Sequence, residues 1–206
     1  MEQNVIAVIV HRGFVYADTF MSIWEMKKPG KFRLASVKGG MLDTARNRAV
    51  QEFLKDQNAT HILFVDSDMV LPQDALVKLL GTGKDIVSGL YFKKEQPHYP
   101  VICRKIGNGY KPIEDYAEGL VEVDGCGAGC LLISREAAET ILKIVGEENS
   151  FPAFFSFAHG ISEDFWFCEK AKEAGLKIFC DTTVKCGHLT ENAVTEGEWK
   201  RKSGIV

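Results

Sequence analysis

The chain lacks any apolar run long enough to cross a membrane. Its N-terminus also lacks the basic residues and uninterrupted apolar stretch that mark a signal peptide. Charge of one sign is missing too, because the formal net charge is only −3 over 206 residues. Nothing global therefore recruits nucleic acid or an anionic membrane surface. From these absences we expect a cytoplasmic protein without a membrane span.

Closely spaced cysteine pairs are absent as well. The six cysteines are scattered, with three residues between Cys126 and Cys130 and five between Cys180 and Cys186. Zinc ribbons use tighter pairs, and disulfides are not expected without export, so we expect free thiols. The 46% content of hydrophobic residues is sufficient for a core, and the length suits one domain.

Short apolar segments alternate with amphipathic ones in the first half of the chain, which is typical of an α/β sheet. The expected strands are residues 4–10, 32–36, 61–65 and 86–91. The expected helices are residues 19–26, a helix that Asp43 or Thr44 caps, and a helix that Pro72 opens and Gly81 ends.

The second half is less regular. Two short strands, 101–105 and 120–123, flank a turn at residues 107–109 and indicate an antiparallel insertion. Ser134 and Ser162 are placed to cap helices that end near Gly146 and Gly175, and residues 176–180 read as a late strand. Together the segments predict a mixed α/β sheet in one domain.

The most informative motif is Asp66-Ser67-Asp68, directly after the strand expected at 61–65. If the chain is still extended there, Asp66 and Asp68 point to the same side. Two carboxylates suit Mg²⁺ or Mn²⁺, and open α/β sheets bind ligands beyond the carboxyl ends of their strands. Acidic residues after a strand also often cap the next helix, so the motif alone leaves both interpretations open.

Three further segments carry possible chemistry. Asp164 would lie in the first turn of a helix, either as a general base or, with Glu163, only as a complement to the helix dipole. His188 follows the late strand and is either a metal ligand or a surface residue. The segment 125–130 resembles a phosphate loop but lacks its Lys-Ser/Thr ending, and we interpret it as a bend whose backbone approaches a ligand closely.

Taken in order, these pieces resemble a GT-A type glycosyltransferase close to glycosyltransferase family two, including small stand-alone forms that occur in phages. The resemblance implies a Rossmann-like three-layer α/β sandwich in one domain, residues 1–190, with a mixed, mainly parallel sheet and a small antiparallel insertion. Residues 4–100 would be the nucleotide-sugar-binding half, 101–190 the acceptor half and 191–206 a polar basic tail. The pieces that carry it are Ala45-Arg46-Asn47, residues 62–68, residues 86–89, residues 127–135, Ser162-Glu163-Asp164 and Gly187-His188.

The same resemblance implies transfer of a sugar from a nucleoside diphosphate sugar, with UDP favoured, to an acceptor hydroxyl. Asp68 and His188 would hold Mn²⁺ or Mg²⁺, and Asp66 would contact the ribose or the metal through water. Asp164 would be the base, with inversion at the sugar because no second carboxylate is placed as a nucleophile. The other residues implied to contact the donor or acceptor are His11, Arg12, Gly13, Arg46, Ser67, Gly127 and Glu163.

Several alternatives stay open at this point. The Gln-x-x-Arg-Trp motif of processive polysaccharide synthases is missing, so a processive synthase is not expected. An inactive nucleotide- or sugar-binding module is one alternative. A nucleotidyltransferase would want a richer basic glycine loop after the first strand, and a phosphoesterase would want more clustered ligands than five scattered histidines.

The acceptor and the oligomeric state are not readable from the sequence. The acceptor is a glycan, a protein side chain, a small metabolite or a hydroxylated base in DNA. The net charge does not favour DNA, although three short basic runs could form a local patch. These runs are Lys93-Lys94, Arg104-Lys105 and Lys200-Arg201-Lys202.

Overall fold

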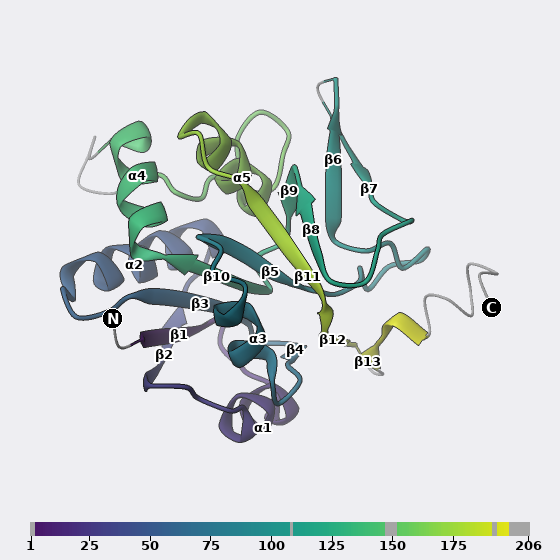
Figure 1. The fold of residues 1–206 in the computed structure, drawn as a ribbon, viewed down its shortest axis with the longest axis horizontal. Helices are drawn as coiled ribbons and strands as arrows, with labels where there is room; N and C mark the ends of the chain where they lie inside the picture. The colour runs from purple at the N-terminus through teal and green to yellow at the C-terminus, as the bar shows by residue number, and fades with distance from the viewer. Residues whose placement is uncertain (1–2, 108, 147–151, 191–192, 198–206) are drawn as a thin grey trace.

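A seven-stranded sheet forms the centre of the protein, seen in a computed structural model that describes residues 3–107, 109–146, 152–190 and 193–197 (Figure 1). The strand order is β2-β1-β3-β10-β5-β11-β8. Only β10 and β8 run against their neighbours, so five of these seven strands point the same way. In sheet order the strands are Lys31–Lys38, Asn4–His11, His61–Asp66, Cys130–Ser134, Ile86–Leu90, Ile178–Lys185 and Leu120–Val123.

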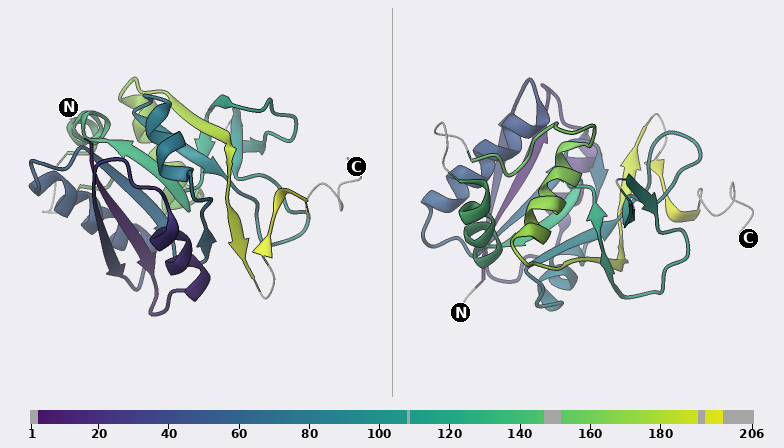
Figure 2. Two further views of the ribbon diagram at one scale, coloured as in Figure 1. Left: turned by 60° about the horizontal axis from the view of Figure 1, so that its bottom comes forward. Right: turned by 90° about the horizontal axis from the view of Figure 1, so that it is seen from above.

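Helices cover both faces of this sheet (Figures 1 and 2). The helices α1 (Ala17–Glu25) and α3 (Ala75–Gly81) pack on one face. The other face carries α2 (Leu42–Lys55), α4 (Arg135–Val145) and α5 (Glu163–Glu173).

Alternate residues of the central strand β3 supply the two apolar cores. Ile62 and Phe64 face the layer of α2, α4 and α5, whereas Leu63 and Val65 face α1 and α3. Side chains alternate along a strand, so a strand with both faces covered is apolar throughout, which is why the segment reads as an uninterrupted apolar run. The three-layer sandwich with a mixed, mainly parallel sheet is confirmed.

Two small antiparallel sheets lie beside the large one. One joins β4 (Met69–Val70), β12 (Gly187–Leu189) and β13 (Ala193–Val194). The other joins β6 (Ile102–Ile106) to β7 (Gly109–Pro112) and to β9 (Gly125–Cys126). The antiparallel insertion is therefore confirmed, but residues 120–123 belong to the main sheet, where Val123 packs into the core.

Most element ends follow local sequence signals. The Ser134 hydroxyl caps α4 by accepting a hydrogen bond from the Ala137 N–H at 3.1 Å, and Gly146 ends the helix with a φ of 67°. Gly175, with a φ of 77°, follows the end of α5. The late strand is longer than expected and covers residues 178–185, because it pairs with β5 and β8.

Two helix starts differ from the sequence prediction. The N-cap of α2 is Met41, so neither Asp43 nor Thr44 caps it; the Asp43 carboxylate accepts a hydrogen bond from the Thr44 N–H instead. Pro72 does not open α3, because residues 73–74 form a turn and the helix begins at Ala75. Within the described residues, no helix has both the length and the apolarity that a bilayer span requires.

The glycine-rich bend at residues 125–130 wraps around the Tyr91 side chain. A Cβ at Gly127 would lie 1.8 Å from Tyr91 Oη, and one at Gly129 would lie 3.1 Å from Tyr91 Cζ. The Gly129 N–H also donates to Tyr91 Oη at 3.2 Å. The Cβ side of both glycines therefore faces a buried tyrosine ring, and the approach of this backbone to a ligand stays a prediction.

Replacing Gly127 by alanine should lower the free energy of unfolding by about 1–3 kcal/mol, the usual cost of overpacking a filled core. Gly40→Ala is the matched control, since a Cβ there meets nothing within 4 Å. Urea denaturation of both variants measures the difference. Equal stability of the two variants would contradict the tight packing against Tyr91.

Candidate active site

A cavity of about 260 Å³ opens where β1 and β3 end. β1 and β3 run parallel, so their carboxyl ends meet at the same edge of the sheet, as the sequence predicts for a ligand site. Segments that follow β5 and β11 contribute further residues to the same cavity. The lining residues are Val10, His11, Arg12, Phe14, Leu42, Asp66, Ser67, Asp68, Lys94 and His188.

The Asp66-Ser67-Asp68 motif forms a turn. β3 ends at Asp66 and residues 67–68 leave the extended conformation, so the premise of a continuing strand is wrong. Both carboxylates nevertheless line the one cavity. The turn is held by the backbone, because the Ser67 carbonyl accepts from the Tyr16 N–H at 3.0 Å and the Asp68 carbonyl accepts from the Leu189 N–H at 2.8 Å.

His188 reaches this turn through the second small sheet, in which it lies opposite Met69. Its Nδ1 lies 2.8 Å from the Phe92 carbonyl oxygen, which only accepts hydrogen bonds, so Nδ1 carries a proton. In the neutral ring, Nε2 then offers its lone pair, and it lies 3.7 Å from Asp68 Oδ1. The Tyr91 ring packs edge-on against the imidazole, with 5.5 Å between the ring centroids.

Asp68 and His188 fit a divalent cation that is completed by a substrate. Among the described residues, no group of three or more His, Cys, Asp or Glu side chains is placed to hold a metal alone. Mg²⁺ is commonly held by one or two carboxylates together with substrate phosphates, and imidazole suits several transition metals. The donor set here therefore suits a cation bound jointly with a diphosphate.

Arg46 lies beneath the cavity and is 1% exposed. Its Nη2 is 2.8 Å from Asp66 Oδ1 and 3.8 Å from Glu163 Oε1. The guanidinium also lies near two aromatic rings, 5.9 Å from the Phe64 centroid and 5.8 Å from that of Phe155. In the described part of the chain its Nε and Nη1 have no hydrogen-bond partner. Arg46 thus links the end of β3 to the start of α5.

The neighbouring residue on α2 fixes the segment before α5. The Asn47 amide nitrogen donates to the Phe155 carbonyl at 2.8 Å, and the Phe155 N–H donates to the Asn47 side-chain oxygen at 2.9 Å. Two neighbouring residues of α2 therefore hold this region: Asn47 binds Phe155 before α5, and Arg46 pairs with Glu163 at the start of α5.

Burial governs the charges under the cavity. It raises the pKa of Asp66, while Arg46 opposes the rise and the negative charges of Asp68 and Asp164 add to it. Burial also raises the pKa of Glu163, again against the attraction of Arg46. Burial tends to lower the pKa of Arg46, but its acidic neighbours outweigh this and raise it, so the guanidinium stays charged.

Asp164 is the second residue of α5 and is partly buried. Its Oδ1 accepts a hydrogen bond from its neighbour's backbone, Phe165 N–H, at 2.9 Å, and it contacts the Ser162 hydroxyl. Ser162 is the N-cap of α5 by position, yet its side chain makes no capping bond. Asp164 does not line the 260 Å³ cavity, but its charge is felt at Asp66 and Arg46.

The residues expected near the nucleotide are only partly brought together. His11, Arg12 and Ser67 line the cavity; the His11 ring contacts Ser36 Oγ at 2.9 Å and accepts from the Gly13 N–H at 3.1 Å. Arg46 and Glu163 lie below it and Gly127 packs against Tyr91. The prediction missed Phe14 and Leu42 as lining residues, and considered Lys94 only for its charge, because nothing local distinguishes them.

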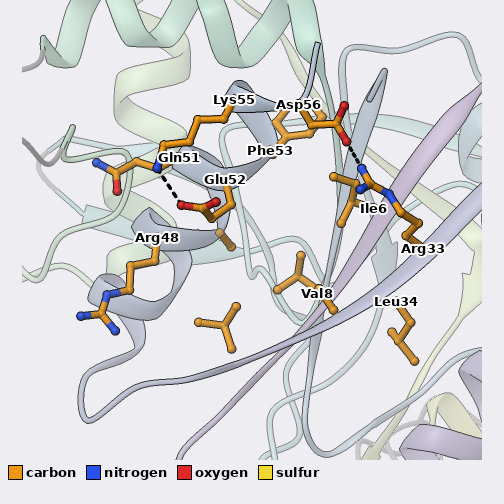
Figure 3. A pocket seen from close by; sticks show the side chains of 13 residues that line it. Ile6, Val8, Arg33, Leu34, Arg48, Gln51, Glu52, Phe53, Lys55 and Asp56 are labelled. Carbon is orange, nitrogen blue, oxygen red and sulfur yellow. Dashed lines mark hydrogen bonds and ion pairs between the residues drawn. The ribbon is translucent and has the colours of Figure 1, made fainter. Parts of the chain in front are cut away.

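A larger groove of about 860 Å³ lies between α2 and the strands β1 and β2 (Figure 3). Its wall includes the apolar side chains of Ile6, Val8 and Phe53. Four of the charged side chains drawn there form two pairs, Arg33 with Asp56 and Lys55 with Glu52, whereas Arg48 is drawn apart from them. Because Glu52 and Asp56, the carboxylates that line it, are engaged in these pairs, this groove is a weaker candidate for chemistry than the smaller cavity.

No family model and no curated protein matches the chain. Among solved structures, A197 from STIV is similar with a TM-score of 0.70 and 21% identity, covering 95% of this chain and 92% of that one. GalNAc-T7, crystallised with UDP, GalNAc and Mn²⁺, is similar with a TM-score of 0.61 and 11% identity; the match covers 92% of this chain but 44% of that one. At these identities the likeness shows the fold, and the GT-A type fold expected from the sequence is confirmed.

Arg46→Met should lower the free energy of unfolding at neutral pH by about 3–5 kcal/mol, because it leaves the buried Glu163 and the partly buried Asp66 without their cation. Without Arg46 the raised pKa values of Asp66 and Glu163 rise further above their ordinary values of 3.8 and 4.5. The folded state then binds protons more tightly than the unfolded chain, so the loss should shrink as the pH falls from neutral toward those values.

Urea denaturation at a series of pH values tests this expectation. Arg33→Gln is the control, since it breaks a pair with Asp56 at the surface and should change the stability little. A loss in Arg46→Met that does not change with pH would indicate a packing defect instead of an electrostatic one.

Proposed function

We propose that the chain is a glycosyltransferase of the family-two type that uses Mn²⁺ or Mg²⁺ and moves a sugar from a nucleoside diphosphate sugar to an acceptor hydroxyl. The observation that supports this most is one cavity, at the carboxyl ends of parallel strands, lined by Asp66, Asp68 and His188. The fold is shared with GalNAc-T7, which binds UDP, so UDP is the first nucleotide to test.

The donor would lie along the turn that follows β1 and the turn that follows β3. His11, Arg12 and Gly13 would surround the base, with Ser67 and Asp66 at the ribose. Asp66 cannot turn away freely, because Arg46 holds its Oδ1 at 2.8 Å. Arg46 and Glu163 would therefore support donor binding from below, and Gly127 would support it by leaving room for Tyr91 beside His188.

Asp68 and His188 would hold the cation, which when bound neutralises negative charge on the leaving diphosphate. The protein prepares this position before any ligand arrives. The bond from His188 Nδ1 to the Phe92 carbonyl fixes the ring and the tautomer. Asp66 lines the same cavity and would contact the cation through water.

Asp164 would take the proton from the acceptor hydroxyl while the oxygen of that hydroxyl attacks the anomeric carbon of the donor sugar. The bond between that carbon and the diphosphate oxygen breaks in the same displacement, so the sugar inverts. A double displacement would need a second carboxylate as nucleophile, but Asp66 and Glu163 are both engaged by Arg46. The early strands would thus provide the donor half, residues 4–100, and α5 the acceptor half, residues 101–190.

The acceptor is proposed only as a hydroxyl, on a glycan, a protein, a metabolite or a modified DNA base. Most of the basic tail, including Lys200-Arg201-Lys202, lies outside the described residues.

Asp68→Ala should abolish cation-dependent nucleotide binding, because it removes the only carboxylate proposed to contact the cation directly. Calorimetry against UDP, GDP and CDP with and without Mn²⁺ measures this. Asp74→Ala is the control, since Asp74 pairs with Lys78 outside the cavity and should bind as the wild type does. Mn²⁺-dependent binding that survives in Asp68→Ala would refute the cation assignment.

Asp164→Asn should leave donor affinity unchanged and slow transfer by about 10²–10⁴-fold, because the amide cannot accept the proton. Asp18→Asn is the matched control, as Asp18 is also the second residue of its helix, α1. Product formation from a radiolabelled donor gives the rate and calorimetry gives the affinity. Undiminished transfer would exclude Asp164 as the base, whereas donor binding without any transfer in the wild type would favour an inactive binding module.

A further inference from the structure

Each carboxylate of the Asp66-Ser67-Asp68 turn is paired with a different positively charged side chain. Arg46 Nη2 holds Asp66 Oδ1, and Lys94 Nζ contacts Asp68 Oδ2. The arginine and lysine side chains differ in their freedom to move. The Arg46 side chain is 2% exposed and lies beside two phenylalanine rings, whereas the Lys94 side chain is 30% exposed and lines the open cavity. Of this pair, only Lys94 is able to leave its carboxylate without unfolding its surroundings.

The backbone beneath Lys94 is anchored on both sides. The Lys93 N–H donates to the Tyr99 carbonyl at 2.9 Å, and the Lys93 carbonyl lies 2.9 Å from His98 Nδ1. At the base of the segment, the Val101 N–H donates to the Tyr91 carbonyl at 2.9 Å. A change in the position of the ammonium therefore requires rotation of the long lysine side chain and no movement of the segment.

We propose that Lys94 is a cationic placeholder, which neutralises Asp68 until a divalent cation binds and then contacts the diphosphate of the donor. This inference rests on the proposed function, because it assigns a role within the same site. It adds a residue for which the resemblance implies no role in catalysis.

The reason is electrostatic. A cation shared by Asp68 and His188 Nε2, now 3.7 Å apart, would face an ammonium already in contact with the same carboxylate. Like charges at such a separation repel, and the Lys94 side chain is exposed enough to yield. A diphosphate in the same cavity offers the displaced ammonium new anionic oxygens, with which lysine pairs as a point charge. The cation and the donor should therefore bind more favourably together than either does alone.

Lys94→Gln separates the two roles. Without the competing ammonium, Mn²⁺ should bind the nucleotide-free protein more tightly, by about twofold to fivefold, which is the range expected from loss of a partly exposed ion pair. Loss of the diphosphate contact should slow transfer at saturating Mn²⁺ by at least about tenfold. Lys94→Arg keeps the charge and should recover most of the transfer rate.

Electron paramagnetic resonance of free Mn²⁺, titrated with the nucleotide-free protein, gives the cation affinity independently of activity. The matched control is Lys172→Gln, because the Lys172–Asp124 pair has similar side-chain exposures, 34% and 28% against 30% and 23%, and lies outside the cavity. This control should change neither the Mn²⁺ affinity nor the transfer rate.

The outcomes are distinguishable. If the wild type binds Mn²⁺ and Lys94→Gln binds it no more tightly, the placeholder role is wrong while the proposed function stands. If Mn²⁺ binding tightens but transfer is unchanged, the contact with the diphosphate is wrong. If the wild type binds neither Mn²⁺ nor nucleotide, the proposed function itself fails, and this inference with it.

Discussion

The ion pairs of Arg46 are the interaction on which the rest of the site depends. A guanidinium carried by α2 reaches through the apolar layer to Asp66 on β3 and Glu163 on α5. Burial of a charge is costly, and two carboxylates with two neighbouring aromatic rings offset that cost. Three elements far apart in the sequence are thereby fixed relative to one another. The Arg46 side chain alone thus holds Asp66, which is expected at the ribose, and α5, which carries the expected base Asp164.

The two acidic residues of the turn consequently have different mechanical properties. Asp66 is held by the buried guanidinium of Arg46 and keeps one orientation. Asp68 faces the cavity between an exposed lysine and a histidine whose tautomer is set by the Phe92 carbonyl. A carboxylate held by a buried arginine suits recognition of a constant part of a ligand, whereas one paired with an exposed lysine suits exchange of that lysine for a metal ion. This division follows from the burial of their partners, Arg46 and Lys94, because the two carboxylates are chemically identical and similarly exposed, at 26% and 23%.

Strand pairing outside the main sheet is the second constraint on the site. The short strands β4 and β12 place His188 opposite Met69, one residue after Asp68. The glycine-rich bend closes over Tyr91, and the Tyr91 ring in turn packs against the His188 ring. The bend thus contributes to the site by packing behind a ligand residue, although it resembles a loop that would contact a phosphate directly.

The sequence by itself determined the central strands, the Ser134 cap, the mixed α/β class and the position of two carboxylates at a strand end. Each of these depends on neighbouring residues, on the periodicity of apolar side chains or on a capping hydroxyl. Tertiary structure alone decided that Arg46 is buried, that β8 joins the main sheet and that the bend surrounds Tyr91. It also decided that the Lys94 ammonium pairs with Asp68. The physical reason is sequence separation: Lys94 is 26 residues from Asp68, Gly129 is 38 from Tyr91, and Asn47 is 108 from Phe155. Contacts over such separations form only when the whole sheet is assembled, and no local pattern encodes them.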